Sequence, residues 1–256
     1  MSTKTVARPA PEPQALGPHW RRSFDLTMWM CLYVAKWFLL IMLVIGVGVA
    51  LVYRYNTVPE VSIVQFGQQA GLWFGFSMMI MCGVMTPTYI MNGITRSGAA
   101  TGSLVTAAGL AATFSMSLVL LLMLERPLFG ALGWRAGLAD DPNEPAAGYA
   151  LPLLLFLFLL YWAGNVSGLL VHTAYYRLGG LLGTAALPLT LAPVLLAAVY
   201  GTNAGTPWGT AQDILPTALS LDLGVWQPAL PLALIIVASA AHYRLTITMA
   251  LAPKEA

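Results

Sequence analysis

Charged residues are scarce in this chain. Of its 256 residues only 9% are Asp, Glu, Lys or Arg, whereas 58% are hydrophobic. A soluble domain carries about 25% charged residues, so this composition excludes one, and it equally excludes a disordered chain. Long windows hold no charged residue at all: 37–53, 61–95, 97–124, 145–176, 178–212 and 223–243. A helix crosses the hydrocarbon core with about 20 apolar residues, so the pattern predicts an all-α, polytopic membrane protein.

Reactive and metal-binding residues are few as well. None of the three lysines follows a glycine-rich loop, which excludes a Walker-type phosphate-binding loop in this chain. Cys31 and Cys82 lie far apart in apolar sequence without a CxxC motif, which favours two buried thiols. His19, His172 and His242 do not have metal-ligand spacing. We therefore expect no metal site and no cofactor in the chain itself.

The charge-free windows predict six transmembrane helices. Residues 1–18 contain four prolines and no apolar run, which indicates a disordered cytoplasmic tail before a single six-helix domain over 19–256. The amphipathic stretch from His19 to Lys36 predicts an interfacial helix that leads into the first span. A plain extension of that span is the alternative. The expected spans are 35–53, 69–91, 102–124, 150–172, 180–200 and 229–249.

The distribution of basic residues predicts the orientation, because cytoplasmic loops carry an excess of Lys and Arg. An even number of spans puts both termini on one side. With the termini in the cytoplasm, eight basic residues lie inside: Lys4, Arg8, Arg21, Arg22, Arg96, Arg177, Arg244 and Lys254. Only Arg54, Arg126 and Arg135 lie outside. The outer segment 201–228 is too apolar for a solvated loop, so we expect it to re-enter the membrane before the last helix.

Two residues invite a catalytic interpretation. Ser167 on the fourth expected span and His242 on the sixth resemble the dyad of rhomboid-type intramembrane proteases, and Asn165–Gly168 resembles their Gly-x-Ser-Gly motif. However, Asn165 replaces the first glycine, and no glycines follow the histidine. The simpler interpretation is that Ser167 hydrogen-bonds between helices while His242 marks the water boundary. An intramembrane enzyme therefore remains only an alternative.

The expected spans contain no ionised pair deep in the membrane. Carriers coupled to ion gradients usually place Asp, Glu, Arg or His there, because function offsets the cost. Without such a pair and without a nucleotide-binding loop, a transport function would require an external motor.

Two turn sequences resemble a known family. Met91-Asn92-Gly93-Ile94-Thr95-Arg96-Ser97 lies between the second and third spans, and Tyr175-Tyr176-Arg177-Leu178-Gly179-Gly180 follows the fourth. Together with the six-helix layout and the outer re-entrant segment, they resemble permease subunits of bacterial ATP-binding-cassette exporters of the second class, in particular short actinobacterial ones. The chain departs from the commoner pattern after Arg96, where Ser97-Gly98-Ala99-Ala100 replaces a further basic residue and aromatics.

The resemblance implies a mechanism with several partners. Two permease chains, identical or paralogous, would form the unit in the bacterial inner membrane, and two ATPase chains would hold ATP and magnesium. Nucleic acid has no part in it. The loop that couples to the ATPase would comprise Asn92, Gly93, Ile94, Thr95, Arg96 and Ser97. Gly93 suits a tight turn there, and Thr95 can cap the third helix.

Further positions are candidates within the same framework. Arg177 is a candidate cytoplasmic contact, although a helix C-terminus followed by Gly179 explains it without a function. Candidate residues of a cavity between two protomers are Phe74, Phe76, Met78 and Met79. The cargo expected by analogy is hydrophobic or amphipathic, such as a lipid, an antibiotic or a peptide. The alternative function is that of a noncatalytic accessory or immunity protein of the membrane.

Overall fold

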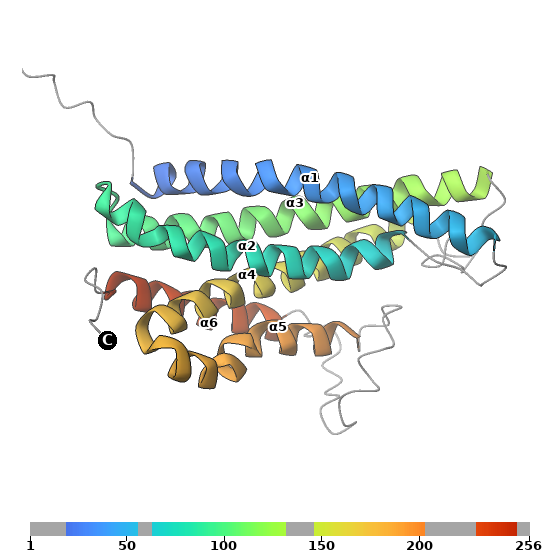
Figure 1. Cartoon of the computed structure of the whole chain (residues 1–256). Coiled ribbons are helices and arrows are strands. Elements are labelled where there is room, and N and C mark those ends of the chain that lie inside the picture. Colours follow the sequence, from blue (N-terminus) through green and yellow to red (C-terminus); the bar gives the residue numbers. More distant parts are fainter. Residues whose placement is uncertain (1–18, 56–62, 132–145, 203–228, 250–256) are drawn as a thin grey trace, which may run out of the picture.

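The protein is described by a computed structural model over residues 19–55, 63–131, 146–202 and 229–249 (Figure 1). These residues form helices and turns without any strand, which confirms the expected all-α class. The helices are α1 (His19–Tyr55), α2 (Ile63–Met91), α3 (Arg96–Ala131), α4 (Ala146–Ala185), α5 (Leu187–Thr202) and α6 (Ala229–Ile247). The tail 1–18 and nearly all of the outer segment 201–228 lie outside the described residues.

Five of the helices are long and apolar enough to cross a membrane. They are α1, α2, α3, α4 and α6, and their apolar windows mark the chain as membrane-embedded. The apolar part of α5 is shorter, at Leu187–Ala198. The fifth span was expected to begin at residue 180. A helical segment does begin there, directly after the kink at Gly179, and it continues to Ala185, where the single turn residue Ala186 separates it from α5.

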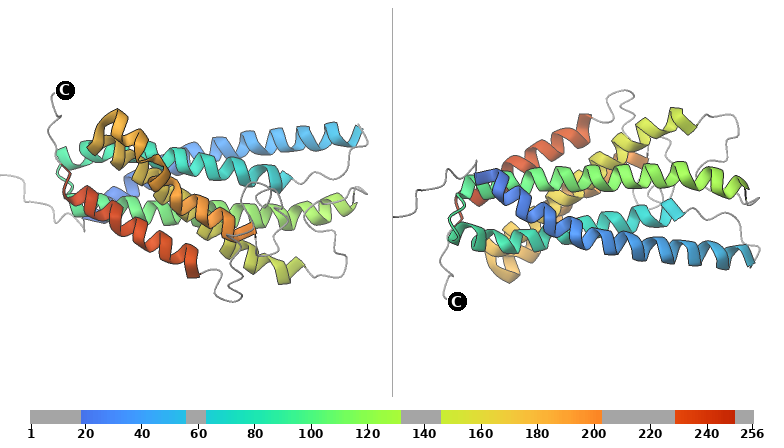
Figure 2. Two further views of the ribbon diagram at one scale, coloured as in Figure 1. Left: turned by 90° about the horizontal axis from the view of Figure 1, so that it is seen from below. Right: turned by 90° about the horizontal axis from the view of Figure 1, so that it is seen from above.

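The helices form a bundle in which both described chain ends lie at the same end (Figures 1 and 2). The starts of α1 and α3 and the ends of α2, α4 and α6 meet there. This end also carries most of the basic side chains of the described residues, and we call it the basic end. Its arginines are Arg21, Arg22, Arg96, Arg177 and Arg244.

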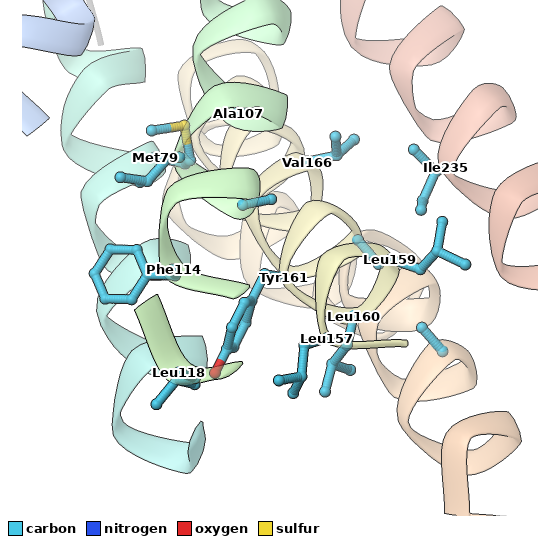
Figure 3. Packing of buried hydrophobic residues seen from close by; sticks show 14 of the residues in the cluster. Met79, Ala107, Phe114, Leu118, Leu157, Leu159, Leu160, Tyr161, Val166 and Ile235 are labelled. Carbon is cyan, nitrogen blue, oxygen red and sulfur yellow. The ribbon is translucent and has the colours of Figure 1, made fainter. Parts of the chain in front are cut away.

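α4 is the central helix of the bundle. In its most apolar stretch 72% of the residues are buried, against 17% in α1. Tyr161 and Leu157 of α4 pack beside Phe114 and Leu118 of α3, and Val166 and Leu159 face the side on which Ile235 of α6 lies (Figure 3). Because α4 contacts α2, α3, α5 and α6, its side chains decide how the other helices are arranged.

Small residues let α2 and α4 approach each other closely. A Cβ added at Gly168 would overlap the carbonyl oxygen of Phe76, and one at Gly164 would lie 2.7 Å from Leu72 Cδ1. From the other side, a Cβ at Gly75 would lie 2.5 Å from Asn165 Oδ1. Both helices therefore present glycines four residues apart to their interface. Such small-xxx-small spacing is a common means of packing helices in lipid, where burial of apolar surface gives no driving force.

α1 is one unbroken helix, so the structure agrees with the alternative, a plain extension of the first span, and shows no separate interfacial helix among the described residues. Four of its buried residues fall four apart, at Ser23, Thr27, Cys31 and Ala35. They form a stripe of small side chains that packs on α3. A Cβ at Gly102 of α3 would lie 2.6 Å from Ser23 Cβ. The helix continues through residue 35 because its first turns are already part of the bundle.

Aromatic rings fill the middle of the bundle. The ring of Phe74 stacks on that of Phe38 at a centroid distance of 4.2 Å and lies 5.5 Å from that of Phe114. Phe114 meets Tyr161 edge-on at 6.2 Å. These four rings join α1, α2, α3 and α4 at one level, so the core is filled by side chains of a single chain.

A folded corner connects α4 to α5. Gly179 adopts φ 75° and ψ −175°, so the long helix ends before it, as the glycine cap predicted from the sequence requires. The Tyr175 hydroxyl then lies 2.9 Å from Thr184 Oγ1, and Gly183 packs against the Tyr175 ring. These contacts fix the direction in which the chain returns along α4.

The close α2–α4 contact predicts the effect of one added methyl group. We expect Gly168→Ala to lower the free energy of unfolding by about 1–3 kcal/mol, because the Phe76 carbonyl is backbone and cannot move aside alone. The measurement is thermal unfolding of the purified chain in detergent or nanodiscs.

The matched control is Gly48→Ala in α1, where a Cβ meets nothing within 4 Å. This change is expected to leave the melting temperature unchanged or slightly raised, because Ala favours helix over Gly. Equal melting temperatures for the two variants would contradict the close packing at Gly168.

Candidate functional site

Buried polar side chains follow the inner side of α4 towards the basic end. Tyr161 is the first, and its hydroxyl donates to the Gln68 carbonyl of α2 at 3.1 Å. One turn on, Asn165 Nδ2 donates to the Ala107 carbonyl of α3 at 2.8 Å. Both side chains are buried. A polar group in an apolar interior costs free energy unless it is paired, so these bonds fix α2, α3 and α4 relative to one another.

The most connected polar side chain is His242 of α6. Its Nδ1 lies 3.1 Å from Thr173 Oγ1 of α4, and its Nε2 lies 3.1 Å from Ser103 Oγ of α3. Thr246 Oγ1 is a further neighbour of Nε2, at 3.5 Å. The His242 side chain is only 3% exposed. One imidazole thus joins three helices, and we call His242, Ser103, Thr173 and Thr246 the His242 cluster.

The residues suggested as a catalytic dyad do not form one. Ser167 lies six residues before Thr173, which is about 9 Å along α4. Its Oγ is buried without a hydrogen-bond partner, whereas both ring nitrogens of His242 contact other hydroxyls. The simpler interpretation was wrong for Ser167, whose Oγ makes no bond between helices. His242 is buried in the bundle, and its place at the water boundary stays a prediction.

The α2–α3 turn, the candidate coupling loop, is short and internally bonded. Gly93 has φ 88°, and the Gly98 amide donates to Thr95 Oγ1 at 3.1 Å, so the expected tight turn and helix cap are confirmed. Asn92 Nδ2 donates to the Thr88 carbonyl at 2.9 Å. Exposed side chains of the turn are Asn92, Thr95 and Ser97, while Arg96 is partly exposed. The turn therefore offers a preformed polar surface at the basic end.

Within that turn Ile94 has a different role from its neighbours. Its side chain is 4% exposed, and its amide donates to the Tyr89 carbonyl at 3.1 Å. It anchors the turn to the bundle.

Arg177 lies at the same end and contacts the end of α6. Its guanidinium donates to Thr248 Oγ1. The structure thus gives Arg177 an intramolecular role, a link between α4 and α6 beside the His242 cluster. A contact with another chain stays a prediction.

The candidate cavity residues of α2 lie in different surroundings. Met79 is completely buried beside Gly168, and Phe74 belongs to the aromatic contacts in the middle of the bundle. Phe76 and Met78 are partly exposed, and the Phe76 ring meets Trp73 edge-on at 5.8 Å. Within one chain these side chains serve packing, and the lining of a cavity between two copies stays a prediction.

The two cysteines meet although 51 residues separate them. Cys31 Sγ of α1 and Cys82 Sγ of α2 are 3.4 Å apart, and both residues are buried. The expected buried thiols are confirmed. Within the described segments no group of three or more His, Cys, Asp or Glu side chains gathers into a metal site.

The sequence reasoning missed Ser103 and Thr173. For Thr173 a usable signal was the number of residues that separates it from an arginine of the basic end. Thr173 precedes Arg177 by four residues, and His242 precedes Arg244 by two. Ser103 lies seven residues after Arg96, so counting from the arginines brings Thr173 near His242 but does not find Ser103.

No protein-family model, no curated protein and no solved structure matches this chain.

The bond from Asn165 predicts a measurable stability loss. Asn165→Ala is expected to lower the free energy of unfolding by about 1 kcal/mol, because it removes an interhelical hydrogen bond. The matched control is Ser117→Ala, whose hydroxyl bonds only to the Thr113 carbonyl of its own helix. The measurement is thermal unfolding of both variants in one lipid. A control as damaging as Asn165→Ala would argue against the interhelical role.

The thiol pair predicts a specific cross-link. Treatment of the membrane-embedded chain with iodine, a membrane-permeable oxidant, is expected to join Cys31 and Cys82 within one chain, because their sulfurs already touch. Mass spectrometry of non-reduced peptides would detect the product. Cys31→Ser serves as the control. Cross-links only between chains would contradict the packing of α1 on α2.

Proposed function

We propose that this chain is the membrane-spanning permease subunit of an ATP-driven exporter of the ATP-binding-cassette type, with the ATPase on separate chains. The observation that carries the proposal is the α2–α3 turn. Its sequence, Asn92-Gly93-Ile94-Thr95-Arg96-Ser97, resembles the coupling turn of such permeases, and it is an internally hydrogen-bonded, polar surface at the basic end. A surface that receives the movement of a motor must be stiff enough to pass it on to the helices.

The charge distribution supports the orientation that this function needs. Arg21, Arg22, Arg96, Arg177 and Arg244 gather at the basic end. By the positive-inside rule that end faces the cytoplasm, where ATP and its motor are found. Both termini then lie in the cytoplasm, and the membrane is the inner membrane of a bacterium. In this arrangement α5 completes a sixth crossing and the outer segment 201–228 re-enters the membrane.

The chemistry of the chain supports a division of labour. It has no glycine-rich loop followed by lysine, so the energy of ATP must come from a partner that holds ATP and magnesium. A second copy or a paralogue completes the pathway. The cargo is a hydrophobic or amphipathic compound, in keeping with the large exposed apolar side chains of the bundle. Export is the direction that the family resemblance implies.

The test is whether an ATPase chain co-purifies with this protein. The chain is extracted from its native membrane in a mild detergent, and the co-purified proteins are identified by mass spectrometry. We expect an ATPase with Walker motifs. Replacement of Asn92–Ser97 by a glycine-serine turn should reduce its recovery at least about tenfold, since 1.4 kcal/mol of lost contact already gives a factor of ten.

Single arginines provide the matched pair for this test. Arg96→Ala alters the turn, whereas Arg244→Ala removes an exposed arginine from the same end but from α6. We expect weaker ATPase recovery for the first and unchanged recovery for the second. Absence of any ATPase under several mild conditions would overturn the proposal and favour an accessory role.

A further inference from the structure

α6 contacts the bundle along a single stripe, and His242 is part of it. The buried residues of the helix are Pro231, Ile235, Ala238, His242 and Thr246. Most of the stripe is apolar or small, and α6 lies at the edge of the bundle (Figure 2). His242 bonds to side chains of both α3 and α4. At the basic end this imidazole therefore attaches α6 to the bundle, together with the contact between Arg177 and Thr248.

The hydrogen bonds determine which ring nitrogen carries a proton in the neutral state. Thr173 Oγ1 donates its one hydrogen to the Leu169 carbonyl at 2.7 Å. It has none left for His242, so it accepts a hydrogen from Nδ1 at 3.1 Å. The neutral imidazole is thus protonated at Nδ1, and Nε2 is left as an acceptor.

The Ser103 hydroxyl can either donate a hydrogen bond to His242 Nε2 or accept one from it. Its hydroxyl lies 2.9 Å from the Ala100 carbonyl and 3.1 Å from His242 Nε2. With its hydrogen on Nε2, Ser103 bonds the neutral ring. With its hydrogen on the carbonyl, the same oxygen presents a lone pair and accepts a hydrogen from Nε2. A rotation about one C–O bond converts the pocket from a site for imidazole into a site for imidazolium.

We propose that His242 is a proton-binding site, and that proton uptake from water at the basic end releases α6 from α3 and α4. The proton adds to the Nε2 lone pair and no other bond is broken. The hydroxyls of Thr173 and Ser103 then both accept from the ring. The hydrogen bonds of the ring survive, so the cost of proton uptake comes from the buried charge alone.

The charged and titratable groups along the packed helices do not offset that charge. The nearest along each helix are neutral or basic: His172, Tyr175, Tyr176 and Arg177 on α4, Arg96 on α3, and Tyr243 and Arg244 on α6. The α5 sequence from Leu187 to Thr202 has no Asp, Glu, Lys, Arg or His. Glu125 of α3 is 22 residues beyond Ser103, about 33 Å along the helix.

His172 adds a further reason for the helices to separate. It directly precedes Thr173, the partner of His242 Nδ1, and its Nε2 is buried without a hydrogen-bond partner. A buried charge without an acidic partner is costly, and hydration removes the cost. The exposed side chain of Arg244 is only two residues from His242, so water needs to advance by about one helical turn. Protonation therefore favours the state in which the end of α6 has moved away.

The first experiment examines the ring directly. The full chain with ring-¹⁵N-labelled histidine is placed in lipid bilayers, and solid-state NMR is recorded from about pH 8 to about pH 3.5, because burial disfavours the charged ring. The chain has only three histidines, so His19→Gln and His172→Gln assign the remaining signals. We expect His242 to be neutral with its proton on Nδ1 at pH 8 and to become imidazolium at the acidic end. An Nε2-protonated ring at pH 8, or no titration, would overturn the proposal.

The second experiment measures the movement. Hydrogen–deuterium exchange of the chain in nanodiscs is compared at the two pH values, after correction for intrinsic exchange rates. We expect residues 239–247 to exchange at least about tenfold faster at acidic pH in the wild type. His242→Gln, which keeps an amide for hydrogen bonding but takes up no proton, should lose this acceleration.

The controls separate a proton site from a merely structural histidine. His172→Gln should keep the acceleration, although shifted in pH because a neighbouring titratable group is gone. Ser103→Ala should raise exchange of α6 already at pH 8, because the Nε2 partner is lost. Equal exchange at both pH values in the wild type would overturn the coupling. Neither experiment needs an ATPase, so failure here leaves the proposed export function untouched, and the reverse also holds.

Discussion

Close approach of the α2 and α4 backbones is the contact on which the rest of the bundle depends. In lipid, apolar side chains gain nothing by leaving their surroundings, so helices associate through contact area and hydrogen bonds. Gly168 and Gly164 on α4 and Gly75 on α2 bring the two backbones together. Only at this separation does Asn165 fit beside Gly75 and reach the Ala107 carbonyl of α3.

In this arrangement the contacts between helices become more polar from the middle of the bundle to its basic end. In the middle of the bundle the contacts are aromatic, with Phe38, Phe74 and Phe114 in one group. Towards the basic end they become hydrogen bonds between side chains, and His242 is their centre. The apolar part resists separation because cavities are costly. The polar contacts towards the basic end depend on hydrogen bonds whose donors and acceptors water can also satisfy.

Local features were predictable from the sequence, and long-range contacts were not. Gly93 and Thr95 mark the α2–α3 turn by their own conformational and capping preferences, and the structure agrees. Hydropathy located the five helices that are long enough to cross a membrane, but it could not specify which side of each faces a neighbour. The partners of His242 lie 139 and 69 residues away, and no periodicity encodes such a pairing.

The errors have the same origin. The expected boundary near residue 35 rested on the charge of Lys36, yet α1 continues because small residues on its other side pack on α3. The Lys36 ammonium instead lies over the Tyr33 ring, 4.2 Å from its centroid. A charge reports where water is near one face of a helix, not where the helix ends.

The unbroken length of α1 has a mechanical consequence. At 1.5 Å per residue its 37 residues measure about 55 Å, whereas the hydrocarbon core is about 30 Å thick. A tilt of about 20° accommodates only a small part of the difference. α1 therefore extends past the hydrocarbon as a rod, and α3, with 36 residues, runs beside it. Each of these two helices therefore connects the two sides of the bilayer without an interruption of its hydrogen-bonded backbone over most of its length.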